Sequence, residues 1–130
     1  MQFTITTSKR EEIKDITPKV QEAVSKIADI KNKACLIYTP HATASIIINE
    51  NYDPAVCEDI LDFLKQQIPQ GKWRHDKIDG NADAHIKASI IGPSQVIPIK
   101  DKKLQLGTWQ NIALAEFDGP RERKIIVEVL

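Results

Sequence analysis

Three histidines, His41, His75 and His85, are the side chains of this 130-residue chain best suited to acid-base or metal chemistry. Histidine transfers protons near neutral pH and is the commonest ligand of transition metals, so three converging imidazoles would leave positions open for water or substrate. Their separations of 34 and 10 residues match no local ligand spacing. Convergence therefore depends on the fold, and the alternative is three loop histidines that face solvent or form hydrogen bonds.

Carboxylate and amide groups gather at residues 49–54, Asn-Glu-Asn-Tyr-Asp-Pro, between a predicted strand and a predicted helix. Asp53 followed by Pro54 is typical of a helix start, and Asn51 tolerates turn conformations, so local roles explain these residues equally well. Glu50 has no such local role. It must face solvent or a cleft, and in a cleft it could act as a ligand or a general base.

A second polar segment, residues 79–87, combines turn residues with the start of a predicted helix. Small side chains there would let an anion approach the free amides at the helix N-terminus, and Lys87 would add positive charge. The alternative is an ordinary capped helix with an exposed lysine.

Two of the four arginines, Arg121 and Arg123, lie in one predicted turn. Arginine is preferred for bidentate recognition of phosphate or carboxylate, which makes both residues candidates for holding an anionic substrate. A surface ion pair with Asp118 or Glu122 is the alternative. Trp109, which precedes this turn, is expected to pack rather than to stack on a ligand.

The formal charges balance, with 18 Lys and Arg against 18 Asp and Glu. This balance argues against a general nucleic-acid binder, which needs an excess of cations, but it permits a small phosphorylated ligand. No apolar run approaches the roughly 18 residues of a membrane span, and the first residues lack a basic and an apolar leader region. We therefore expect a cytoplasmic protein without membrane contact. Cys35 and Cys57 form no Cys-x-x-Cys pair and are expected to be reduced core thiols.

Hydrophobic periodicity predicts the elements that must position these residues. Apolar residues at helical spacing after Thr17-Pro18 and Asp53-Pro54 predict two helices. A third, short helix is expected to be capped by Asn81 or Asp83 and to run through 85–91. The length and the pattern predict one domain, 1–130, with an α+β fold: a β-rich sheet or sandwich partly covered by about three helices. The predicted strands span residues 2–7, 12–17, 34–39, 45–49, 95–99, 104–106, 108–117 and 124–130.

Six polar segments follow one another along nearly the whole chain. They are His-Ala-Thr-Ala-Ser at 41–45, Asn-Glu-Asn-Tyr-Asp-Pro at 49–54, Trp-Arg-His at 73–75, Asn-Ala-Asp-Ala-His-Ile-Lys at 81–87, Gly-Thr-Trp-Gln at 107–110 and Arg-Glu-Arg at 121–123. Together and in this order they resemble the YjbQ family. The resemblance implies a compact α+β or sandwich-like protomer, assembled as a homotrimer with the polar motifs near subunit boundaries. It also implies a weak, secondary thiamine-phosphate synthase activity, in which a pyrimidine pyrophosphate is joined to a thiazole phosphate with loss of pyrophosphate.

The resemblance further implies roles for individual residues. One departure is Ala42-Thr43, where related sequences often carry Thr-Ser, so Thr43 and Ser45 are left to bond a ligand and substrate preference is expected to differ. The implied catalytic residues are His41, His75, His85 and Glu50, with the three histidines also holding a divalent metal such as zinc. The implied substrate-binding residues are Ser45, Asn51, Asp53, Lys87, Gln110, Arg121 and Arg123.

We therefore expect a trimeric enzyme of thiamine-phosphate-synthase type that acts on a small anionic, phosphorylated substrate. Arg121, Arg123 and Lys87 would neutralise the departing phosphate charge, and Glu50 would serve as base or as a partner of the metal ligands. Magnesium prefers oxygen ligands whereas three imidazoles suit zinc, so a zinc-dependent hydrolase of a phosphorylated or ester substrate is an alternative. A non-enzymatic trimer that binds a small anion or metal is a third possible interpretation.

Overall fold

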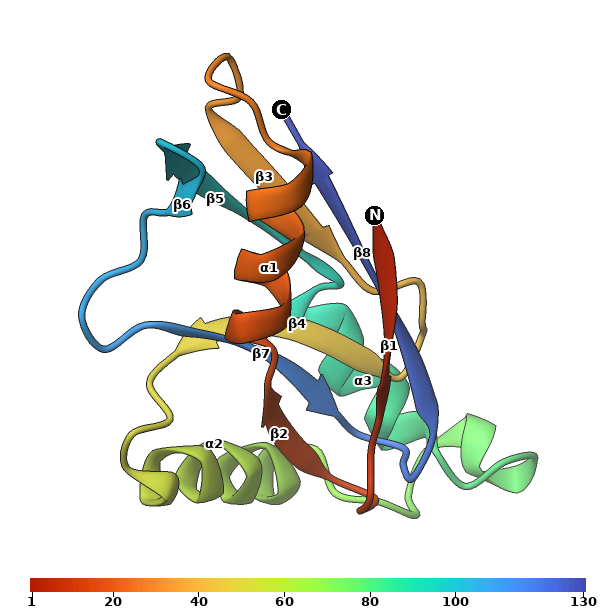
Figure 1. Ribbon diagram of the computed structural model, residues 1–130. Coiled ribbons are helices and arrows are strands. Elements are labelled where there is room, and N and C mark those ends of the chain that lie inside the picture. The colour runs from red at the N-terminus through yellow and green to blue at the C-terminus, as the bar shows by residue number, and fades with distance from the viewer.

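Apolar strands build two antiparallel sheets in the computed structural model, which describes residues 1–130 (Figure 1). The five-stranded sheet has the order β1-β8-β3-β5-β6, and the three-stranded sheet has the order β2-β7-β4. Three α-helices complete the fold, so the predicted α+β class is confirmed. The strands are β1 (Gln2–Thr6), β2 (Glu12–Asp15), β3 (Ala34–Tyr38), β4 (Ala44–Asn49), β5 (Ser94–Lys100), β6 (Lys103–Leu104), β7 (Asn111–Glu116) and β8 (Glu122–Val129). The helices are α1 (Thr17–Ile27), α2 (Pro54–Gln67), α3 (Ala82–Ile91) and the short 3-10 helix η1 (Arg74–Lys77).

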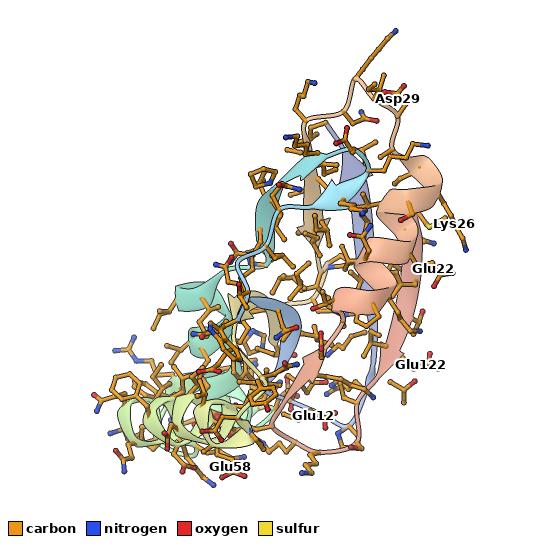
Figure 2. All side chains as sticks on the ribbon, turned by 60° about the vertical axis from the view of Figure 1, so that its left-hand side comes forward. Glu12, Glu22, Lys26, Asp29, Glu58 and Glu122 are labelled. Atoms are coloured by element: carbon orange, nitrogen blue, oxygen red, sulfur yellow. The ribbon has the colours of Figure 1, made fainter.

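Helix α1 covers one face of the five-stranded sheet because its apolar residues recur at helical spacing. Val20 and Val24 are fully buried in the main hydrophobic core, which they share with Ile125 of β8. Figure 2 shows Glu22 and Lys26 on the outer side of this helix, where their charged groups lie 2.8 Å apart. Burial of one face and solvation of the other fix how α1 lies on the sheet.

Helices α2 and α3 meet β7 in a second, smaller core. Leu64 of α2, Ala84 of α3 and Phe117 after β7 are buried together there. Asp53 caps α2 as predicted, since its Oδ1 accepts a hydrogen bond from the Ala55 N–H at 2.9 Å. None of the helices combines the length and the apolarity that a bilayer crossing needs.

Helix α3 begins as predicted, whereas strand β7 begins later than predicted. Asn81, one of the two residues expected to cap α3, occupies the N-cap position before Ala82, and its carbonyl accepts from the Ala84 and His85 amides at 3.0 and 3.3 Å. Strand β7 begins at Asn111 rather than at 108, because a turn precedes it. The turn is closed by the Gln110 amide, which donates to the carbonyl of residue 107 at 3.0 Å.

The antiparallel pair β4–β7 separates the polar segments into two groups. Ala44 lies opposite Glu116 at one end of this pair, and Asn49 lies opposite Asn111 at the other. In Figure 1, α3 lies behind the right-hand half of the pair and the 74–77 turn lies to its right, whereas the loops before α2 and before β7 lie on the left. The histidines and arginines therefore occupy one end of the molecule, and the 49–54 segment occupies the other.

Candidate functional site

Two open cavities adjoin at the histidine end of the molecule. The first, called the polar cavity, has a volume of about 680 Å³, and the second, called the aromatic cavity, has a volume of about 550 Å³. The His85 side chain lines both. The polar cavity is bounded mainly by His41, Thr43, Asn81, Asp118, Arg121 and Arg123, and the aromatic cavity by Trp73, Arg74, His75, Ala82 and Ile86.

His75 and His85 form an edge-to-face pair in the wall of the aromatic cavity. Their ring centroids are 5.0 Å apart and their planes meet at 88°. Asp76 fixes the turn that carries His75, because its carboxylate accepts from the amides of Gly71, Trp73 and Ala82 at 2.9–3.1 Å. These hydrogen bonds, the Trp73 amide first among them, lower the pKa of Asp76 below its ordinary value. One carboxylate thus ties the 71–77 turn to the start of α3.

His41 faces the polar cavity as a neutral imidazole. Its Nε2 accepts a hydrogen bond from the Lys124 amide at 2.9 Å, so the proton of the neutral ring lies on Nδ1. Partial burial and the nearby charge of Arg123 lower the pKa of His41 below its ordinary value. His41 can therefore donate a hydrogen bond without bringing a net charge to the cavity.

The three histidines do not form one ligand set within a single chain. No group of three or more His, Cys, Asp or Glu side chains lies close enough to hold a metal ion. His75 and His85 adjoin, while His41 and His85 share only the lining of the polar cavity. The donors of one chain therefore do not fit the predicted three-histidine metal site.

The two arginines of the predicted turn differ in how freely they can meet a ligand. The Arg121 side chain is 54% exposed at the rim of the polar cavity, and it pairs with Asp118 at 3.1 Å. Arg123 is buried, and its Nε lies 2.9 and 3.0 Å from the two carboxylate oxygens of Glu116. Arg121 keeps donors available to a bound anion, whereas the charge of Arg123 is already neutralised.

Glu116 organises the wall of the polar cavity, a role that sequence reasoning missed. Its carboxylate accepts from the Thr7 hydroxyl at 2.7 Å and from the amides of Phe117 and Asp118 at 3.1 and 3.3 Å. Through Arg123, which also donates to Thr43 Oγ1 at 2.8 Å, it is connected to the loop that carries His41. These groups come from the end of β1, from β7, from β8 and from the loop before β4, so no local motif could have revealed the network.

Lys87 lies in the interior rather than in either cavity. Its ammonium lies 2.9 Å from Asp83 and 3.3 Å from Glu11, and the lysine has no exposed surface. Arg10 completes the network with two hydrogen bonds to Asp83 at 3.0 and 3.2 Å. Lys87 thus balances a buried carboxylate, and its predicted contact with a substrate has no geometric support in this chain.

Comparison with known proteins decides the family. The family model described as UPF0047 protein YjbQ-like matches residues 1–130. The chain belongs to the YjbQ family. UPF0047 protein MJ1081 of Methanocaldococcus jannaschii is 51% identical over 128 residues, which cover 98% of this chain and 91% of that protein. UPF0047 protein YugU of Bacillus subtilis is 43% identical, with coverage of 97% and 95%.

Solved structures of the YjbQ family share the same fold. The crystal structure of an uncharacterized YjbQ/UPF0047 protein from Clostridium acetobutylicum has a TM-score of 0.94 and 44% identity, covering 100% of this chain and 99% of that one. A hypothetical protein from Aeropyrum pernix has a TM-score of 0.93 and 41% identity, covering 100% and 96%. The predicted family is confirmed. The function of this family is unknown.

The remaining YjbQ segments lie away from the two cavities. Glu50, Asn51 and Asp53 follow β4 at the far end of the β4–β7 pair. Gln110 is exposed at the same end, where its Oε1 accepts from the amide of residue 107 at 2.8 Å. Ser45 is buried, and its hydroxyl donates to the Ala88 carbonyl at 3.3 Å. Within one YjbQ chain these five residues and the histidines do not share a cavity, so their site roles stay predictions.

Proposed function

We infer that the protein is a transferase of thiamine-phosphate-synthase type that holds the phosphate groups of its substrate in the polar cavity. The observation that carries this proposal is the half-exposed Arg121 beside His41 and His85 in one cavity. A guanidinium with free donors favours a phosphate dianion, because charge-assisted hydrogen bonds to phosphate are strong and directional. A small phosphorylated substrate is the ligand class that this arrangement fits best.

Four side chains that line the polar cavity have a part in the proposed reaction. The carbon–oxygen bond between the pyrimidine methylene and pyrophosphate breaks, and the thiazole nitrogen forms the new carbon–nitrogen bond. Negative charge then grows on the departing pyrophosphate, and Arg121 would stabilise it. His41 and His85 would donate hydrogen bonds to the same oxygens. Arg123 would keep the wall in place through Glu116.

The test is the formation of thiamine phosphate from the pyrimidine pyrophosphate and the thiazole phosphate. Replacement Arg121→Ala should reduce turnover at least tenfold while the circular dichroism spectrum and the melting temperature stay close to wild type. Lys31→Ala, which removes an exposed cation away from both cavities, is the matched control and should keep full activity. Unchanged turnover in Arg121→Ala would reject the role of Arg121. If the wild-type protein shows no turnover, the transferase proposal is rejected. The alternative of a protein that binds phosphate without transferring a group is then favoured.

We propose further that the active protein is a homotrimer. Leu36, Tyr38, Val96 and Ile126 are register neighbours on the face of the five-stranded sheet that points away from the core. Val96 is 58% exposed, and contiguous exposed apolar residues are typical of association surfaces. Light scattering that gives the mass of a single chain would contradict the trimer, and Val96→Lys should dissociate it.

A divalent ion such as zinc stays a separate proposal, as does zinc-dependent hydrolysis. His75 and His85 could supply two ligands of such a site, and the others would have to come from outside the single-chain cluster. Elemental analysis of the purified wild type and of His85→Ala tests this. Equally negligible zinc in both proteins would eliminate the metal.

A further inference from the structure

We propose that the aromatic cavity binds the flat, uncharged ring of a ligand whose phosphate lies in the polar cavity. The inference rests on the proposed function only in taking the polar cavity as the phosphate site. It adds a second binding site, built on Trp73 and Ile86, and it assigns the chemical class of the group that occupies it. The ligand would be a phosphorylated aromatic compound bound across both cavities.

The two cavities adjoin at the first turn of α3. Asn81, the N-cap residue, lines the polar cavity, Ala82 lines the aromatic cavity, and His85 lines both. The His85 imidazole is therefore the side chain that the two cavities share. A ligand that extends from the polar cavity past this imidazole would enter the aromatic cavity.

The walls of the aromatic cavity suit a ring rather than a second charged group. Trp73, Ala82 and Ile86 are apolar, and Arg74 is the one lining residue with a permanent charge. Guanidinium groups stack on aromatic faces, so this charge is compatible with a ring. A volume of about 550 Å³ lies in the ordinary range of small-molecule sites and is ample for a single ring.

The Trp73 indole is held in place before any ligand arrives. Its Nε1 donates to the Pro69 carbonyl at 2.7 Å, and the Lys72 ammonium lies 5.6 Å from the indole ring centroid. The Trp73 amide is fixed in addition by Asp76. Because the indole is already anchored, little side-chain freedom would be lost on binding, which favours affinity.

The test compares methyl phosphate with benzyl phosphate, which carry the same dianion and differ in the ring. Wild-type protein should bind benzyl phosphate about tenfold more tightly in a calorimetric titration, the gain expected from burying roughly half of a phenyl surface. In proton–nitrogen correlation NMR spectra, benzyl phosphate should shift the Trp73 indole N–H resonance, and methyl phosphate should not.

Two isoleucines of α3 provide a variant and its matched control. Ile86→Asn should bring the ratio of the two affinities close to one while methyl phosphate binds as in wild type. Ile90→Asn, one turn further along the helix at a side chain that is 68% exposed and lines neither cavity, should keep the tenfold ratio. The ratio is measured within each protein, so a small loss of stability in Ile86→Asn does not affect it.

The outcomes separate this inference from the function on which it rests. Binding of methyl phosphate with no gain for benzyl phosphate in wild type would overturn the ring site alone. So would a gain that survives in Ile86→Asn, or a Trp73 indole resonance that benzyl phosphate leaves unmoved. Failure of both compounds to bind would overturn the phosphate site, and the ring site with it.

Discussion

Arg123 and Glu116 neutralise each other inside the protein, directly beneath the polar cavity. The arginine Nε lies 2.9 and 3.0 Å from the two carboxylate oxygens, and the exposed fractions of the side chains are 4% and 0%. Two charges this deeply buried lose most of their hydration, and only their mutual contact and further hydrogen bonds compensate for that loss. The pair therefore contributes to the shape of the site rather than to its net charge.

Breaking this pair from one side should be more damaging than removing it. Arg123→Met leaves Glu116 as a buried carboxylate without its cation, and we expect the free energy of unfolding to fall by about 3–5 kcal/mol. The double variant Arg123→Met/Glu116→Leu should recover a large part of that loss, since no charge remains buried. Urea unfolding of both proteins checks this. A double variant less stable than Arg123→Met would contradict the argument.

The elements of this fold could be predicted from the sequence because they depend on local patterns. Alternation around Phe3 and Ile5 gives β1, and the cap and first-turn pair Asp53-Pro54 starts α2. The pairing order of the strands depends on contacts between distant segments, which a single sequence does not encode in any local pattern. Nothing in the spacing of Ser45 and Glu50 therefore indicates that they lie outside the histidine cavities.

In the candidate site, too, the sequence predicts contacts between neighbouring residues but not contacts that depend on tertiary packing. The pair of Arg121 with Asp118, three residues away, was anticipated as an alternative and is confirmed. The pair of Arg123 with Glu116 spans a chain reversal, and burial of Lys87 beside Asp83 depends on how α3 packs. Side chains that look alike in the sequence are separated into free and neutralised cations only by tertiary packing.

Asp83 should make the stability of the protein sensitive to acid. Burial alone would raise its pKa, but hydrogen bonds from Arg10 and Lys87 outweigh that effect and hold the pKa below the ordinary value. The unfolded chain then takes up the proton first. The stabilisation is therefore complete above pH about 4 and is lost as pH falls through the lower, folded-state pKa.

The variant Asp83→Asn tests this linkage. It should be clearly less stable than wild type at pH 7, where Lys87 and Arg10 lose their shared carboxylate, and the difference should shrink as pH approaches 3. Asp101→Asn, in an exposed turn, is the control and should change stability little at either pH. A difference between wild type and Asp83→Asn that is constant from pH 7 to 3 would show that the ionised carboxylate is not the stabilising group.

His41 should titrate below the ordinary histidine value of about 6.5. Partial burial and the charge of Arg123 both disfavour the imidazolium, and a protonated Nε2 could not accept from the Lys124 amide. The stabilisation by the neutral ring is present above pH about 6.5 and is lost as pH falls through the folded-state pKa.

NMR titration of the His41 ring measures this pKa directly. Replacement Arg123→Met should raise it, since a positive neighbour disappears and Glu116 remains. In unfolding experiments His41→Gln, which keeps an acceptor for the Lys124 amide, should show a shallower loss of stability below pH 6.5 than wild type. A midpoint at or above 6.5 in the wild-type protein would contradict the effect assigned to burial and to Arg123.

Gly119 should tolerate no side chain, because the turn that carries Asp118 and Arg121 is closed around it. A β-carbon at this position would collide with the Lys9 carbonyl and would lie 2.9 Å from both Glu116 Cγ and Thr7 Oγ1. Backbone cannot move aside as a flexible side chain can, so Gly119→Ala should cost about 1–3 kcal/mol of stability. It should also weaken methyl phosphate binding, since the Thr7 hydroxyl that would be displaced accepts from the Arg121 amide at 2.8 Å.

Gly107→Ala is the matched control, because its β-carbon would meet only the flexible Gln110 side chain, at 3.3 Å. Equal melting temperatures and equal phosphate affinities for the two variants would mean that the 116–121 turn is not what holds Arg121 at the cavity rim.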